Sequence, residues 1–120
     1  MANKSVLTLV FSSPGTFQNG LLALMTTIPQ ISAVLVAEDI NSTLRMVENH
    51  QPALVILDLS PPDMQDVIKQ IKEVCPGIQI IVFAEDIAQK EYVEAHGVDY
   101  VLIKGFSAQS LITIVENIND

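Results

Sequence analysis

The sequence predicts an open α/β fold in which helices cover both faces of a parallel sheet. Five short apolar runs alternate with five segments of helical period, which is typical of consecutive βαβ units. A strand comes first, and the order is kept throughout. With 120 residues, 49% of them hydrophobic and 17% charged, the chain is long enough for one buried core, and we expect a single domain over residues 1–120.

The expected strands are the five apolar runs. The third and fourth runs are nearly unbroken, as in strands that are covered on both faces, and we therefore expect them to be central in the sheet. In chain order the runs are Val6 to Phe11, Ala33 to Ala37, Ala53 to Leu57, Ile78 to Phe83 and Tyr100 to Ile103.

The expected helices follow from apolar residues at helical spacing. They cover residues 17–28, 41–49, 64–74, 86–96 and, after a Ser107 cap, 108–118. The first stops before Pro29, and the fourth has Gly97 as its C-cap. The helix over 41–49 has a narrow apolar face, and Pro52 fixes only where it must have ended.

Charge and composition exclude several classes of function. The net charge of −8 would repel a phosphate backbone, so direct contact with nucleic acid is not expected. The single cysteine, Cys75, cannot form an internal disulfide. No apolar run approaches the ~18 residues that span a bilayer, and no secretion leader is recognisable. We expect a cytoplasmic protein without membrane contact.

Chemistry is expected at the carboxyl ends of the strands, where open α/β sheets bind their ligands. Asp58 ends the third apolar run and is followed by a Pro61-Pro62 turn. An acid at that place is costly unless a charged or polar group meets it, and Lys104, which ends the fifth run, is the obvious partner. The other residues at this edge are Ser12, Ser13, Glu38, Ala84 and Glu85.

Three segments resemble the receiver domains of bacterial two-component response regulators, most closely the NarL/FixJ type. They are Phe17-Gln-Asn-Gly-Leu, the stretch from Gln51 to Met64 around Asp58, and Gly97-Val-Asp-Tyr-Val-Leu-Ile-Lys. The resemblance covers the whole length and implies a flavodoxin-like (CheY-like) three-layer sandwich. That fold has five parallel strands in the order 2-1-3-4-5 and five helices.

The resemblance also implies roles for individual residues. Asp58 corresponds to the residue that accepts a phosphoryl group from a histidine kinase, and Lys104 to the lysine that contacts the phosphoryl oxygens. The two acidic residues that hold Mg²⁺ in the family are replaced by Ser12 and Ser13. The hydroxyl residue that the family has after the fourth strand is replaced by Ala84. If the chain is shifted by one residue against the family pattern, it is replaced by Phe83 instead.

These replacements predict a degenerate phosphorylation site, that is, a pseudo-receiver. Phosphoryl transfer depends on neutralisation of charge by Mg²⁺, which carboxylates hold, so no cofactor is expected unless Glu38, Glu85 or Asp86 substitutes for the lost acids. The expected function is phosphorelay signal transduction by contact with a histidine kinase, an output domain or another receiver, and not an enzymatic activity.

Alternatives remain at the level of sequence. Asp58 in a working receiver would still take a phosphoryl group in the presence of Mg²⁺. A pocket left less acidic by Ser12 and Ser13 would admit a small molecule or anion. For pairing with a protein or with a second copy, the candidate apolar anchors are Tyr100, Phe106 and Ile112.

Overall fold

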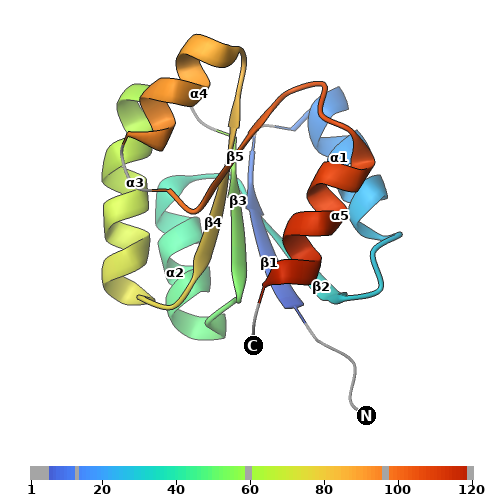
Figure 1. Cartoon of the computed structure of the whole chain (residues 1–120). Coiled ribbons are helices and arrows are strands. Elements are labelled where there is room, and N and C mark those ends of the chain that lie inside the picture. Colours follow the sequence, from blue (N-terminus) through green and yellow to red (C-terminus); the bar gives the residue numbers. More distant parts are fainter. Residues whose placement is uncertain (1–5, 13, 59–60, 96–97, 119–120) are drawn as a thin grey trace.

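The computed structural model describes residues 6–12, 14–58, 61–95 and 98–118, with the backbone alone for 61–65. Within these residues five parallel strands form one sheet in the order β2-β1-β3-β4-β5 (Figure 1). The strands are β1 (Val6–Phe11), β2 (Ile31–Ala37), β3 (Leu54–Leu57), β4 (Gln79–Ala84) and β5 (Tyr100–Ile103). The helices between and after them are α1 (Thr16–Met25), α2 (Ile40–His50), α3 (Pro61–Val74), α4 (Ile87–Glu94) and α5 (Ala108–Asn117). The predicted fold and strand order are therefore confirmed.

The helices form two layers around the sheet. Figure 1 shows α1 and α5 on one face and α2, α3 and α4 on the other. This arrangement follows from the right-handed crossovers between parallel strands, because the direction of winding reverses after β2. The carboxyl ends of all strands therefore meet at one edge of the sheet.

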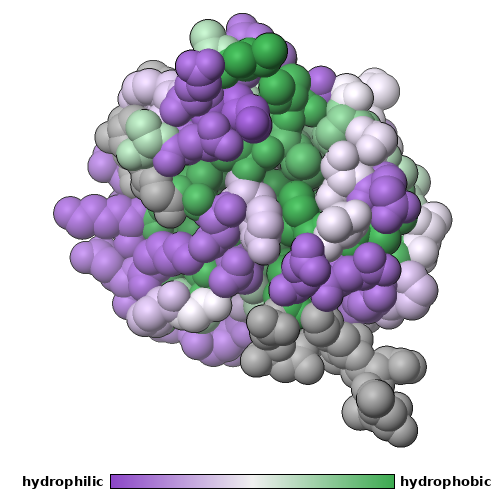
Figure 2. Space-filling view, viewed as in Figure 1, coloured by the Kyte–Doolittle hydropathy of each residue, from purple (hydrophilic) through white to green (hydrophobic). Residues whose placement is uncertain are grey.

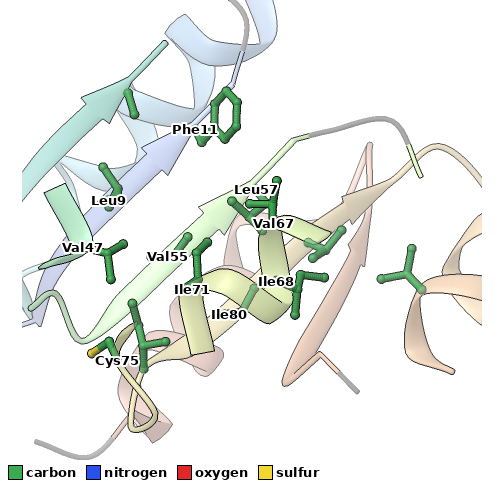
Figure 3. Close-up of a cluster of buried hydrophobic side chains, with 14 residues drawn as sticks. Leu9, Phe11, Val47, Val55, Leu57, Val67, Ile68, Ile71, Cys75 and Ile80 are labelled. Atoms are coloured by element: carbon green, nitrogen blue, oxygen red, sulfur yellow. The ribbon is translucent and has the colours of Figure 1, made fainter. Parts of the chain in front are cut away.

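Each face of the sheet has its own core. On the α2–α3–α4 side, Leu9, Val55 and Ile80 from three strands pack against Val67 and Ile71 of α3 (Figure 3). On the other side, alternate residues of the same strands pack against α1 and α5. All four side chains of β3 are buried, and neither β3 nor β4 is an edge strand, as their nearly unbroken apolar sequences predicted.

Several element boundaries differ from the prediction, most by one residue and four by two or three, including the start of α3 at Pro61 rather than at residue 64. α1 ends at Met25, because the hydroxyls of Thr26 and Thr27 bond back to carbonyls of the last turn; Ile28 lies beyond the helix but is still buried. β2 begins two residues early, at Ile31, which pairs with Val6 of β1. α4 ends at Glu94 rather than at residue 96, and the expected Gly97 cap lies outside the described residues.

The expected turn at Pro61-Pro62 was wrong, because these residues are the first two of α3. Proline suits the first helical turn, where its missing N–H would have no partner within the helix. The predicted helix over 41–49 was right, and so was the Ser107 cap of α5. None of the described helices is long and apolar enough to cross a membrane.

At the amino-terminal ends of β4 and β5, Asp99 links three neighbouring segments. Its carboxylate lies 2.9 Å from the ammonium of Lys72 and accepts a 2.8 Å hydrogen bond from the backbone N–H of Ile80. Lys72 also donates to the carbonyl of Ile78 at 2.7 Å. These contacts join the end of α3, the start of β4 and the loop before β5.

Candidate functional site

Asp58 is fixed where β3 ends. Its backbone N–H donates to the carbonyl of Phe11 at 2.9 Å, which continues the pairing of β3 with β1 by one residue. The side chain is 19% exposed, and its Oδ1 lies 3.0 Å from Nζ of Lys104. The structure therefore brings together the acid and the lysine that the sequence analysis paired.

Lys104 holds a second acid as well. Its backbone N–H donates to the carbonyl of Ala84 at 2.8 Å, which fixes the end of β5 against β4. The ammonium lies 2.8 Å from Oε2 of Glu85, whose side chain is 62% exposed. It also lies 4.7 Å from the centre of the Phe17 ring, a distance typical of a cation–π contact.

These contacts shift the pKa of Lys104. Partial burial acts to lower it, but hydrogen bonds from the ammonium to Glu85 and Asp58 act in the other direction and prevail, so the pKa lies above the usual 10.5. Lys104 is thus firmly cationic at neutral pH. Since two carboxylates share its one positive charge, the three side chains together carry a net negative charge.

Ser12 is buried and already engaged. Its Oγ accepts a 3.0 Å hydrogen bond from Nε2 of Gln18, and its carbonyl accepts from the same nitrogen at 3.2 Å. Ser13 lies outside the described residues. The sequence analysis did not identify Gln18 as a partner of Ser12. Its position six residues after Ser12, on the buried face of the first helix, could have indicated this contact.

Ala84 is buried at the end of β4, and so is Phe83 before it. The Phe83 ring contacts Phe17 edge-on at 5.0 Å between ring centres and stacks on Phe106 at 5.3 Å. Neither residue offers a hydroxyl. Phe83 is instead the middle one of three aromatic rings that connect α1, β4 and the loop after β5.

The residues present do not fit a magnesium ion. Mg²⁺ prefers carboxylate oxygens, and no three acidic, histidine or cysteine side chains come together anywhere in the described part of the chain. Of the possible substitutes, Glu85 contacts Lys104, Asp86 caps α4 by accepting from the N–H of Gln89, and Glu38 is exposed. Asp58 and Glu85 both contact the ammonium of Lys104, which already occupies the place between them that a metal ion would need.

An apolar hollow of about 390 Å³ opens next to the site, between α1 and the loop that leads into α5. Phe17 belongs to both places, since it lines the hollow and its ring contacts the ammonium of Lys104. The other lining residues are Thr16, Gly20, Leu21, Leu24, Gly105, Phe106 and Ala108.

The three expected anchors for pairing are only partly exposed. Tyr100, Phe106 and Ile112 are partly buried and pack against the core under α1 and α5. The large apolar side chains at the surface include Ile87 and Tyr92 of α4 instead, at 66% and 44% exposure. Figure 2 shows hydrophobic surface at the α4 end of this face.

Comparison with known proteins agrees with the predicted fold. Residues 16–116 match the family model of the response regulator receiver domain, and the chain belongs to this family. It is thus a receiver domain of two-component signalling. No protein of curated function matches the sequence.

Several solved structures share the fold. The receiver domain of a Pseudomonas aeruginosa sensor histidine kinase, which has a magnesium ion coordinated in its active site cleft, is 18% identical with a TM-score of 0.78, over 98% of each chain. A LuxR-family DNA-binding response regulator from Staphylococcus aureus is 18% identical with a TM-score of 0.74, over 96% of this chain and 100% of that one. The pilus assembly protein CpaE from Caulobacter crescentus is 18% identical with a TM-score of 0.71, over 94% and 92%.

Proposed function

We propose that residues 1–120 are one receiver domain of the NarL/FixJ type with a degenerate phosphorylation site. It acts in the cytoplasm by phosphorylation-independent contact with a protein, which is a histidine kinase, an output domain or another receiver, and it has no enzymatic activity or cofactor of its own. The observation that carries the proposal is the Lys104 ammonium, which lies 3.0 Å from Asp58 and 2.8 Å from Glu85.

This arrangement opposes phosphoryl chemistry for an electrostatic reason. A phosphoryl group brings negative charge to a place where two carboxylates already share one lysine, and it would have to displace Glu85 from Lys104. In phosphoryl transfer this charge is neutralised by a metal ion and cationic side chains. At the expected metal positions Ser12 and Ser13 supply no charge, and Ser12 is bonded to Gln18.

The NarL/FixJ type is supported by the likeness to regulators described as LuxR-family proteins. The same fold also serves a pilus assembly protein. Because the fold occurs in proteins of different roles, the proposal rests on the site and on the family rather than on the fold. The partner is proposed to be a protein because the domain's net charge of −8 disfavours nucleic acid.

The test is incubation with acetyl phosphate and Mg²⁺, read by intact mass, with Asp58→Ala as the control. We expect no phosphoryl adduct on the native chain and no heat of Mg²⁺ binding in a titration. An adduct that disappears in Asp58→Ala would refute the degenerate site.

The second candidate is a working phosphoacceptor, in which Asp58 takes a phosphoryl group from a histidine kinase with Mg²⁺ as cofactor. One observation favours it: the Asp58 carboxylate remains partly accessible and contacts the lysine that the resemblance assigns to the phosphoryl oxygens. Under this reading Mg²⁺ binds measurably to the native chain, and Asp58→Ala weakens that binding.

A further inference from the structure

The strand β2 is an open edge of the sheet without the usual protection. Within the described residues it pairs with β1 alone, and Figure 1 shows it at the border of the sheet beside α1. The outer N–H and C=O groups of such a strand are free to pair with another strand, and proteins normally block this with lysine, proline or a very short strand. β2 has seven residues, Ile-Ser-Ala-Val-Leu-Val-Ala, and none of them is charged or proline.

The opposite edge of the sheet is protected. β5 has four residues, all partly buried, and it is bounded by the charged residues Asp99 and Lys104. On β2, by contrast, Ser32, Ala33 and Val36 are exposed. The two edges of one sheet therefore differ in the features that decide whether a strand can be added.

Charge points to the same side of the molecule. No Lys, Arg, Asp or Glu occurs from residue 5 to residue 37, which includes β1, α1 and β2. Since the domain has a net charge of −8, two copies repel each other unless they meet where charge is absent. The edge of β2 and the flanking α1 are such a place.

The sequence of β2 is also complementary to itself. Residues 33–37 read Ala-Val-Leu-Val-Ala, a palindrome centred on Leu35. In an antiparallel pair of two copies with the two-fold axis at Leu35, Leu35 lies opposite Leu35, Val34 opposite Val36, and Ala33 opposite Ala37. Such β-branched and apolar cross-strand pairs stabilise a sheet, and a two-fold axis requires a self-complementary surface.

We propose that β2 is a self-association edge, through which two copies of this chain join their sheets by antiparallel pairing of residues 33–37. This interface is separate from the Asp58–Lys104 site and does not depend on the state of that site. It also differs from an association through the exposed Ile87 and Tyr92 of α4.

The first test is sedimentation velocity of the chain over a series of concentrations up to ~1 mM. We expect reversible dimers, and we expect Val36→Lys to weaken the association by about tenfold or more, because lysine on an edge strand opposes pairing. Val74→Lys is the matched control: Val74 has the same 36% exposure but lies at the end of α3, and its substitution adds the same charge. A native chain that stays monomeric, or equal effects of the two lysines, would overturn the proposal.

A second measurement does not depend on how well a lysine is tolerated. In the Cys75→Ala background, Leu35→Cys is expected to form an intermolecular disulfide under mild oxidation, because the two-fold axis puts residue 35 of both copies opposite each other. Ala33→Cys is the control, since the two residues 33 would be roughly 13 Å apart along the strands, beyond the reach of a disulfide. Equal cross-linking of both variants, or none of either, contradicts the pairing.

Discussion

The carboxylate of Glu85 lies 2.8 Å from the ammonium of Lys104, closer than the carboxylate of Asp58 at 3.0 Å. Glu85 follows β4 and Asp58 follows β3, so Lys104 at the end of β5 ties together three neighbouring strand ends. A cation that pairs with two acids in this way stabilises the edge of the sheet even when no phosphoryl group is present.

The two ion pairs of Lys104 should differ in strength. Asp58 is largely buried and Glu85 largely exposed, and solvent weakens exposed pairs. Double-mutant cycles that combine Lys104→Met with Asp58→Asn or with Glu85→Gln, read by urea unfolding, are expected to give coupling energies of about 1 kcal/mol and about 0.3 kcal/mol respectively. A larger coupling for Glu85 would contradict this order.

Alkaline pH should weaken the fold through Lys104. A pKa raised in the folded state means that the stabilisation is fully present below the unfolded value near 10.5 and is lost as the pH rises through the folded value. We expect the free energy of unfolding to fall above pH 10.5, and to fall less steeply in Lys104→Met. Titration of the Lys104 side chain by NMR gives the folded pKa directly, and a value at or below 10.5 would disprove the assignment.

Removal of the Asp99 carboxylate should be costly. Asp99→Ala leaves the N–H of Ile80 and the ammonium of Lys72 without their common acceptor, and we expect a loss of about 1–3 kcal/mol in the free energy of unfolding. Asp99→Asn should recover part of this loss, because its amide oxygen can still accept from Ile80. Glu94→Ala, which breaks the exposed Lys90–Glu94 pair, is the control and should change stability by less than about 0.5 kcal/mol.

Restoring an acid at Ser12 should create a dependence on metal that we do not expect of the native chain. Ser12 is buried and its side chain is bonded to the neutral Gln18, so Ser12→Asp buries a charge whose neighbour carries none, and we expect a destabilisation of about 1–3 kcal/mol. Millimolar Mg²⁺ is expected to raise the thermal midpoint of Ser12→Asp and to leave that of the native chain unchanged. A native midpoint that rises with Mg²⁺ would contradict the misfit of this site to the ion.

The sequence was sufficient for the architecture because its signals are local. Nearly unbroken apolar runs identified β3 and β4, and the apolar stripes identified the helices. The ends of helices and strands were predicted wrongly where they depend on a contact that the spacing of apolar residues does not reveal. The back-bonding hydroxyls of Thr26 and Thr27 end α1, and the pairing of Ile31 with Val6 extends β2.

The site was predictable in part. Asp58 and Lys104 could be paired because each ends an apolar run, and parallel strand ends meet at one edge. That Glu85 would turn to Lys104, while Asp86 caps α4, could not be predicted, because both are single acids after the same strand. The contact of Phe17 with Lys104 was missed for a similar reason, since a residue on an apolar helical stripe gives no sign of which charge lies above its ring.

Cys75 is a natural probe of local unfolding in this domain. The thiol is buried where α3 ends, and its backbone is bonded on both sides, to Ile71 and to Ile78. Because Cys75 is only 8% exposed, a thiol reagent should react with it mainly in molecules in which the contacts between the end of α3 and the start of β4 have opened. The rate of labelling of Cys75 therefore measures how often the contacts between α3 and β4 open. Because the Lys72–Asp99 ion pair joins the same elements, we expect faster labelling when either residue is replaced by alanine.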